Sequence, residues 1–253
     1  MDLGLADRVY VVTGASRGLG RAGAEQAARR GRPAGGRARK AEALDGLVQQ
    51  APPARCWRCP ATSPTPSLPG RLCASAMARY GRIDGALVSV GGPPPGSTDQ
   101  ITDEQWRSAF DSVFLGPLRL ARAVIDATSV EGSSIVLVLS TSVRSPIAGL
   151  AVSNGLRPGL AMLVKTLADE AGPRGVRVNA LLPGRIDTDR VRELDEASGR
   201  PASNRRDSEA GIPLRRYGEP AEFGRVATFV LSPAASYLTG AAIPVDGGAT
   251  RAL

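Results

Sequence analysis

Arg8-Val-Tyr-Val-Val-Thr13 is followed at once by Gly14-Ala-Ser-Arg-Gly-Leu-Gly20, and together they give the strongest local indication of the fold. Its β-branched and aromatic residues predict a strand, and the sequence after the glycines, up to Arg30, predicts a helix. Because they lack a Cβ, Gly14, Gly18 and Gly20 allow a tight turn and let a phosphate approach the first N–H groups of that helix. A glycine-rich turn can also be only a turn, so the rest of the chain must support a binding role.

Further along the chain, apolar runs of strand length alternate with helical patterns. The runs are Ile83–Val90, Ser134–Leu139 and Val176–Leu182, and the predicted helices are Thr102–Ala127, Ser153–Ala171 and Glu219–Leu231. This alternation predicts parallel strands with helices on both faces. We therefore expect an α/β fold, a Rossmann-like doubly wound parallel sheet, formed by residues 1–253 as a single domain.

One stretch, from about residue 32 to residue 75, breaks this pattern. It should hold two strands, yet it is rich in Arg, Pro and Gly, and no Val, Ile, Leu or Phe occurs between Arg29 and Ala43. Glycine and proline are poor strand residues. A local reading-frame error in an arginine-rich gene is one explanation, and resequencing the DNA across the stretch tests it.

The composition excludes several kinds of site. The chain has no histidine, which rules out Ser-His-Asp and Cys-His catalysis and histidine metal ligation. Its three cysteines, Cys56, Cys59 and Cys73, are too few for a disulfide framework or a four-thiolate zinc site. The lone Cys56–Cys59 spacing is weak evidence for a redox or metal site, so we expect no metal.

Charge and hydropathy favour a soluble protein. The net charge of +8 could attract nucleic acid, but it reflects a general bias toward arginine, and no nucleic-acid-binding motif accompanies it. No apolar run approaches the roughly 18 residues that cross a bilayer, and the first ten residues lack the pattern of a secretory signal. The expectation is a cytoplasmic protein without a membrane or nucleic-acid partner.

The chain resembles the short-chain dehydrogenase/reductase family over nearly its whole length, apart from about residues 32–75. Thr13–Gly20 matches the family's TGxxxGxG signature, and Asp84–Gly92 resembles its fourth strand ending in NAG, with Ser89 in place of Asn. The other matches are to the RVNxxxPGxxxT segment and the carboxy-terminal TG and DGG motifs, at Val176–Thr188, Thr239-Gly240 and Asp246–Gly248. The resemblance implies an oxidoreductase that acts on a carbonyl or a secondary alcohol with a nicotinamide cofactor.

The resemblance also implies which residues hold that cofactor. The glycine loop would bind the phosphates, Gly91 would lie near the adenosine ribose, and the last four would line the nicotinamide end: Gly14, Ser16, Arg17, Gly18, Leu19, Gly20, Gly91, Pro183, Gly184, Ile186 and Thr188. Arg17 and Arg39 favour NADP over NAD, because cationic groups accommodate the 2′-phosphate. Arg39 is equally consistent with a solvated surface arginine.

The catalytic pattern of the family is largely replaced. The resemblance aligns Leu150 with the catalytic tyrosine, Asn154 with the lysine and Val113 with the supporting asparagine. Leu150 has no proton to donate, and Asn154 supplies no cation to lower a neighbouring pKa. Ser142, favoured over Ser140, keeps the serine that would orient the substrate carbonyl. A serine that only caps the end of a strand is an equal alternative.

Two functions remain open. One is an NADP(H)-dependent oxidoreductase with degenerate catalytic residues, and the other is a non-catalytic NADP(H)-binding sensor or scaffold. The resemblance further implies a homodimer or homotetramer that packs through helices Thr102–Ala127 and Ser153–Ala171. The polar segment Thr188–Pro213 is expected to cover the substrate pocket as a mobile segment.

Overall fold

The computed structural model describes residues 2–30, 67–128, 130–197 and 199–252. Within them a parallel sheet has the strand order β1-β2-β3-β4-β5. The strands are β1 (Tyr10–Val12), β2 (Gly85–Val88), β3 (Ser134–Val138), β4 (Arg177–Pro183) and β5 (Ala242–Val245). The first four confirm the predicted strands. The fifth was not predicted, because its run of apolar residues is short and contains Pro244, which is unfavourable in a strand.

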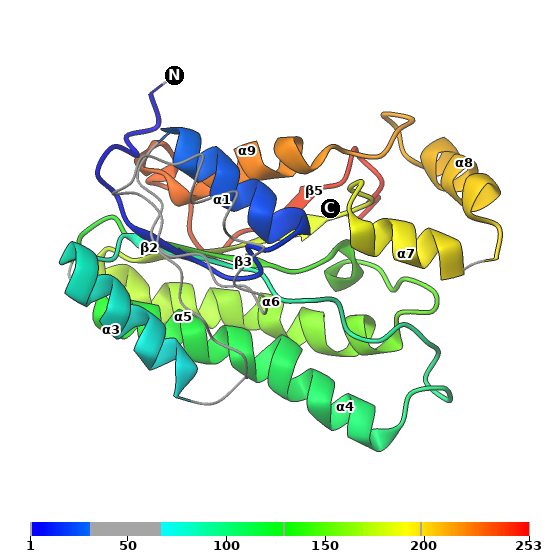
Figure 1. Cartoon of the computed structure of the whole chain (residues 1–253), viewed down its shortest axis with the longest axis horizontal. Helices are drawn as coiled ribbons and strands as arrows, with labels where there is room; N and C mark the ends of the chain where they lie inside the picture. The colour runs from blue at the N-terminus through cyan, green and yellow to red at the C-terminus, as the bar shows by residue number, and fades with distance from the viewer. Residues whose placement is uncertain (1, 31–66, 129, 198, 253) are drawn as a thin grey trace.

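Helices cover both faces of the sheet (Figure 1). α1 (Gly18–Arg30) and α9 (Pro220–Leu231) lie on one face, and α3 (Leu68–Tyr80), α5 (Gly116–Ala127) and α6 (Ala151–Ala171) lie on the other. Each face has its own apolar core. Tyr10 and Val12 of β1 pack with Phe223 on the α9 side, while Val11 packs on the opposite side. The alternation buries every residue of the strand and confirms the doubly wound arrangement.

The helix predicted at Thr102–Ala127 is interrupted by a π-helical segment. α4 (Asp103–Ala109) begins with a capping box, in which Thr102 Oγ1 accepts from Gln105 N and Gln105 Oε1 accepts from Thr102 N. η2 (Phe110–Leu115) follows and leads directly into α5. Pro117 has no N–H to donate to the carbonyl four residues earlier, and Gly116 N instead donates to Asp111 O, five residues back.

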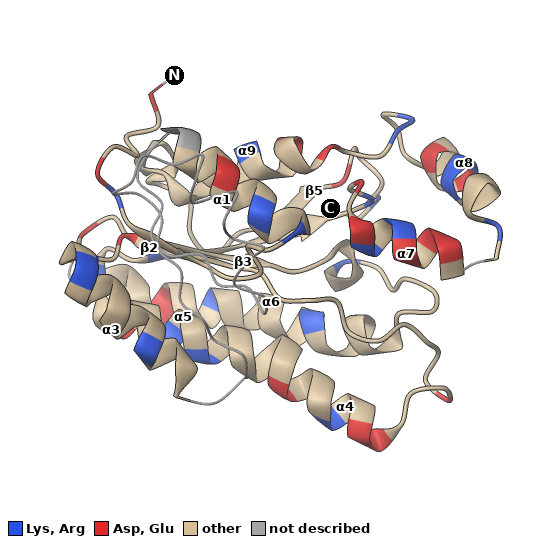
Figure 2. Cartoon of the chain, in the orientation of Figure 1, with Lys and Arg blue, Asp and Glu red and all other residues tan. Residues whose placement is uncertain are grey.

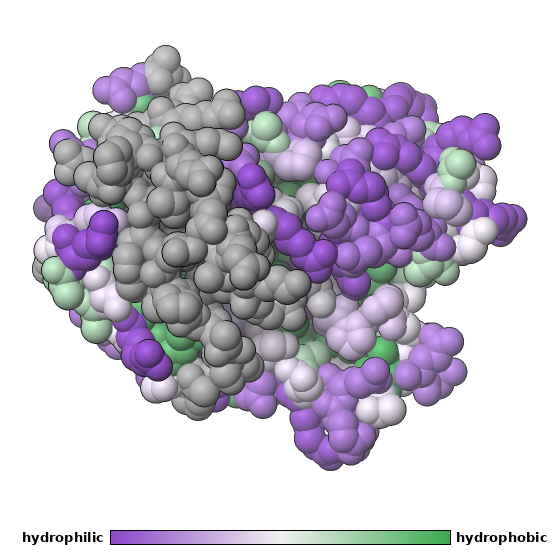
Figure 3. Space-filling view, viewed as in Figure 1, coloured by the Kyte–Doolittle hydropathy of each residue, from purple (hydrophilic) through white to green (hydrophobic). Residues whose placement is uncertain are grey.

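The segment predicted to be mobile forms two helices, α7 (Asp189–Ala197) and α8 (Pro201–Gly211). The buried carboxylate of Asp195 joins them, accepting from Asn204 Nδ2 at 2.7 Å and from Tyr217 OH at 3.0 Å. Charged residues of both signs occur along these helices (Figure 2), and the surface over them is mostly hydrophilic in this view (Figure 3). The two helices of this segment were not predicted.

The atypical stretch is only partly described. Its carboxy-terminal end belongs to α3, where Leu68, Leu72 and Cys73 are buried. Arg39, Cys56, Cys59, the two strands expected there and the reading-frame hypothesis concern residues outside the described ranges. The remaining short helices are η3 (Thr141–Val143), η4 (Gly172–Arg174) and η5 (Pro233–Ala235). No helix in the described part of the chain has the length and apolarity that crossing a bilayer requires.

Candidate functional site

A cleft of about 970 Å³ opens where the strands end. It is lined by the glycine loop after β1, by Ser89–Pro93 after β2, by Val138–Thr141 around the end of β3, by Pro183–Ile186 at the end of β4, and by side chains of α6 and α7. Ligands of open parallel sheets bind in the crevice at the carboxyl ends of the strands. The position of this cleft therefore marks it as the candidate site.

The glycine loop is shaped to hold a phosphate. Gly14 and Gly18 have φ angles of +64° and +58°, which side-chain-bearing residues rarely adopt. A Cβ on Gly20 would lie 2.5 Å from Gly14 O, so the loop can close against α1 only with glycine there. α1 begins at Gly18, and the N–H groups of its first turn have no partner within the helix. These N–H groups and the positive end of the helix fit a pyrophosphate.

Arg17 connects this loop to α7. Its Nη1 lies 3.0 Å from Glu193 Oε1, and the two side chains are 56% and 47% exposed. An exposed ion pair of this kind contributes at most about 1 kcal/mol, so a phosphate can take the place of Glu193.

The predicted nicotinamide residues line the same cleft. Pro183, Gly184, Ile186 and Thr188 do so from the end of β4, and Gly91 does so from the end of β2. A Cβ on Gly184 would meet Asp246 at 2.6 Å, which explains the glycine beside the Asp246–Gly248 turn. The structure thus brings together the predicted cofactor residues of the described ranges. Gly20 does not line the cleft itself but packs against the backbone of Thr13 and Gly14.

Leu150 and Asn154 stand at the start of α6. Leu150 is the N-cap and lines the cleft. The side chain of Asn154 is used by the backbone: its Oδ1 accepts from Ile147 N at 3.0 Å and its Nδ2 donates to Ile147 O at 2.9 Å. Val113 is buried in η2. These positions therefore bring no proton donor and no cation to the cleft.

Ser142 is buried, with 4% of its surface exposed, and does not line the cleft. Its Oγ lies 3.0 Å from the Oγ of Ser153, within hydrogen-bonding distance, and Ser153 does line the cleft. The predicted catalytic serine thus reaches the cleft through a second hydroxyl that the sequence analysis did not single out. Ser140 caps the short helix η3, with its Oγ accepting from Ser142 N.

Arg157 is a further cleft residue that the sequence analysis missed. It is 6% exposed, and its Nη1 donates to Val138 O at 2.9 Å and to Leu139 O at 2.8 Å. Burial, together with the charge of Arg190, lowers the pKa of Arg157 to about 10. The sequence carries a signal for this position: Arg157 follows Ser153 by four residues and Leu150 by seven, a helical spacing that puts all three on one face of the helix.

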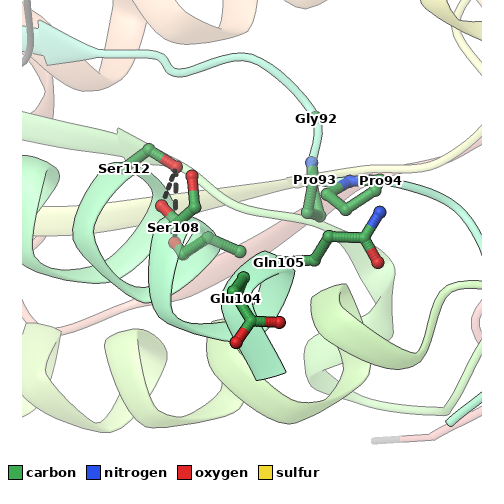
Figure 4. A pocket seen from close by; sticks show the side chains of 8 residues that line it. Gly92, Pro93, Pro94, Glu104, Gln105, Ser108 and Ser112 are labelled. Atoms are coloured by element: carbon green, nitrogen blue, oxygen red, sulfur yellow. Dashed lines mark hydrogen bonds between the residues drawn. The ribbon is translucent and has the colours of Figure 1, made fainter. Parts of the chain in front are cut away.

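A smaller pocket of about 290 Å³ adjoins the cleft. Gly92, Pro93 and Ser112 line both cavities. In Figure 4, Pro93 and Pro94, from the chain after β2, lie opposite Gln105 of α4, and Ser112 donates to Ser108 O. The part of the chain that the structure describes contains no group of three acidic or cysteine side chains placed to bind a metal.

The sheet, its crossovers and the cleft at the strand ends define a Rossmann-like α/β protein. A family model described as enoyl-(acyl carrier protein) reductase matches residues 14–250. An uncharacterised oxidoreductase of Mycobacterium tuberculosis is 32% identical over 97% of this chain and 93% of its own length. The L-rhamnose 1-dehydrogenase (NAD(P)+) of Azotobacter vinelandii is 30% identical over 96% of this chain and 97% of its own length.

Solved structures agree with these relatives. A short-chain dehydrogenase/reductase of Brucella melitensis has a TM-score of 0.90 and 28% identity, with 100% of both chains covered. The L-sorbose reductase of Gluconobacter frateurii, solved with NADPH and L-sorbose, has a TM-score of 0.92 and 26% identity, also over 100% of both chains. The chain belongs to the short-chain dehydrogenase/reductase family of oxidoreductases, whose members bind nicotinamide cofactors.

Proposed function

We propose that this protein binds NADP(H) in the cleft and acts on the carbonyl or secondary alcohol of a small molecule. One observation carries the proposal: the glycine loop and the Pro183–Thr188 segment, far apart in sequence, line one continuous cleft. The loop would hold the pyrophosphate, Gly91 the adenosine ribose, and Pro183, Gly184, Ile186 and Thr188 the nicotinamide. The bound cofactor supplies or accepts the hydride.

The preference for NADP rests on Arg17. Its guanidinium lies beside the glycine loop, and its carboxylate partner Glu193 is exposed and exchangeable. Arg39 is proposed as the second cation. The L-sorbose reductase was solved with NADPH, whereas the L-rhamnose dehydrogenase is named for both cofactors. These relatives are compatible with NADP as the cofactor.

For turnover, Ser142 and Ser153 would act together. Ser153 lines the cleft, and its hydroxyl lies 3.0 Å from that of Ser142, so this pair would hold a carbonyl oxygen in place. Leu150 has no proton to give, so water or the substrate must supply it. We therefore expect slow hydride transfer.

A non-catalytic NADP(H)-binding sensor or scaffold is the second candidate. The observation that favours it is the double hydrogen bond between Asn154 and the backbone of Ile147. Because both polar atoms of the Asn154 side chain are hydrogen-bonded to the backbone, this side chain is not available to bind a substrate or move a proton. Cofactor binding would then be retained for its effect on the shape of the protein.

One experiment separates these possibilities. Calorimetry measures the affinities for NADPH and NADH, and a stopped-flow assay follows NADPH oxidation with a panel of ketones, aldehydes and ketoses. Tight NADPH binding with hydride transfer supports the enzyme, and tight binding without transfer to any acceptor supports the sensor or scaffold. Failure to bind either nucleotide rejects both.

We also propose a homodimer or homotetramer that packs through α4, α5 and α6. Phe110, at the end of α4, is 41% exposed, and Met162 of α6 is 69% exposed. Both are apolar side chains of the kind that interfaces bury. Light scattering after size-exclusion chromatography tests this, and a monomer at micromolar concentration would contradict it.

A further inference from the structure

Among the described residues, five arginines line the cleft, and four of them have a carboxylate within 4 Å. The pairs are Arg17–Glu193, Arg119–Asp111, Arg185–Asp195 and Arg190–Glu193. Arg157 is the fifth, and among the described residues no carboxylate lies within this distance of it. It is nonetheless far more buried than the other four. A buried charge without a counter-ion is costly, and a bound anion removes that cost.

A second buried arginine shows what a purely structural role looks like. Arg177 of β4 donates from both terminal nitrogens to backbone carbonyls: Nη1 to Val230 O and Leu238 O, and Nη2 to Leu231 O and Ser232 O. Its Nε is buried and has no partner among the described residues. Arg157 uses only Nη1 in this way. Within the described residues, its Nε and Nη2 have no acceptor, although the residue lines the cleft.

The free edge of the guanidinium has a defined shape. Nε and Nη2 point two parallel N–H groups in one direction, which matches the two oxygens of a carboxylate. Nη1 is anchored to Val138 O and Leu139 O, so the edge is held in place before a ligand arrives. A rigid donor pair of this kind recognises a planar oxyanion better than a single point charge does.

The location of Arg157 decides between the substrate and the cofactor phosphates as the source of the anion. Its guanidinium is bonded to the end of β3, whereas the glycine loop follows β1, two strands away. Strands lie roughly 4.8 Å apart, so the loop is on the order of 10 Å away, while the Pro183–Thr188 segment follows the neighbouring strand β4. An anion on Arg157 therefore lies toward the proposed nicotinamide end.

We infer that Arg157 is the substrate-recognition residue of the cleft and that the substrate carries a carboxylate group, which the Nε and Nη2 edge of Arg157 binds. This inference builds on the proposed function, because the carbonyl or alcohol that reacts belongs to the same acid. Arg190 adds positive potential from the α7 side of the cleft, held by the bond from its Nη2 to Pro93 O.

The test compares 2-oxo acids with their neutral esters. Pyruvate, 2-oxo-4-methylpentanoate and phenylglyoxylate, and the methyl ester of each, are titrated into the protein by calorimetry, with and without NADP+, which cannot reduce them. At least one acid is expected to bind at least tenfold more tightly than its ester. Arg157→Met is expected to remove this difference while the affinity for NADP+ stays unchanged.

Two further variants keep the test decisive. Arg122→Met removes an exposed arginine of α5 outside the cleft and is expected to bind like the unmodified protein. Arg157→Lys keeps the charge but loses the paired donors, and it is expected to weaken acid binding at least threefold. If circular dichroism shows that Arg157→Met does not fold, the comparison of acids and esters is made with Arg157→Lys instead.

Three results would overturn the inference. In the first, no acid binds the unmodified protein more tightly than its ester, and in the second, the folded Arg157 variants bind the acids with unchanged affinity. In the third, Arg157→Met lowers the affinity for NADP+ at least tenfold and leaves the affinity for the acids unchanged. The last would assign Arg157 to the cofactor. Binding of an acid without any binding of NADP+ or NADPH would instead reject the proposed function and leave the carboxylate site standing.

Discussion

The side-chain amide of Asn154 forms two hydrogen bonds with the backbone of Ile147, one to its N–H and one to its carbonyl. Ile147, Ala148, Gly149 and Leu150 all line the cleft. The side chain of Asn154 therefore shapes the wall of the cleft through the backbone of Ile147.

Replacement of Asn154 by alanine is expected to destabilise the protein and loosen this loop. Two side-chain-to-backbone hydrogen bonds are lost, which costs about 1–2 kcal/mol. Urea unfolding measures the change, and hydrogen exchange at the Ile147 amide measures the local opening. Asn154→Asp is the matched variant, because a carboxylate keeps the acceptor but faces the Ile147 carbonyl without a donor. Unchanged exchange at Ile147 in Asn154→Ala would contradict this assignment.

Replacement of Gly20 by alanine is expected to disturb the glycine loop. The new Cβ would lie 2.5 Å from Gly14 O and 2.6 Å from Thr13 O, so the backbone must move, at a cost of about 1–3 kcal/mol. The affinity for NADPH, measured by calorimetry, should fall at least tenfold.

Gly70→Ala is the control for this change. Gly70 lies in α3, and a Cβ there meets nothing within 4 Å. Alanine is the better helix former, so the free energy of unfolding of this variant should rise by about 0.5–1 kcal/mol. Its affinity for NADPH should be unchanged. Equal behaviour of the two glycine variants would show that the close packing of the loop does not matter.

Removal of the Glu193 carboxylate is expected to favour NADPH. Glu193→Gln frees Arg17 from its ion pair, so the affinity for NADPH should rise about twofold to fivefold, the range of an exposed pair, while that for NADH stays the same. Arg17→Ala should lower the affinity for NADPH more than the affinity for NADH. Equal effects on both nucleotides would show that Arg17 does not face the 2′-phosphate.

Glu222 is expected to stabilise the protein in a pH-dependent way. It lies in the first turn of α9, receives hydrogen bonds from Arg216 at 2.7 Å, and accepts from Glu219 N at 2.7 Å. These bonds, chiefly those from Arg216, lower the pKa of Glu222 to about 2 from its usual 4.5. Because the folded-state pKa lies below the unfolded one, the stabilisation is complete above pH 4.5 and is lost as the pH falls toward 2.

The variant Glu222→Gln tests this pH window. At pH 7 it should be less stable than the unmodified protein by about 1 kcal/mol, the usual effect of a lost helix cap. The difference in Tm should shrink below pH 4.5 and vanish near pH 2. A difference in Tm that stays constant from pH 7 to pH 2.5 would show that the charge of Glu222 is not responsible.

The elements of the sheet were predictable because their signals are local. Four strands and the helices α1, α6 and α9 follow from apolar runs and helical periodicity, with boundaries shifted by one to three residues at most ends. The π-helical segment was missed because hydrogen bonding over five residues changes the backbone pattern without interrupting the apolar pattern. The helices α7 and α8 were missed because a solvated helix that covers a cleft has little apolar periodicity.

The parallel sheet and the glycine loop could be predicted from residue types alone, since buried apolar strands and Cβ-free turns depend on residues close together in the chain. The surroundings of each polar side chain in the cleft depend on the folded arrangement of distant segments. Arg157 lies 18 and 19 residues from the carbonyls that anchor it, and its lack of a carboxylate partner among the described residues depends on where four strands and two helices end. Electrostatic pairing between residues far apart in the chain is set by distance in space, so their spacing in the sequence does not predict it.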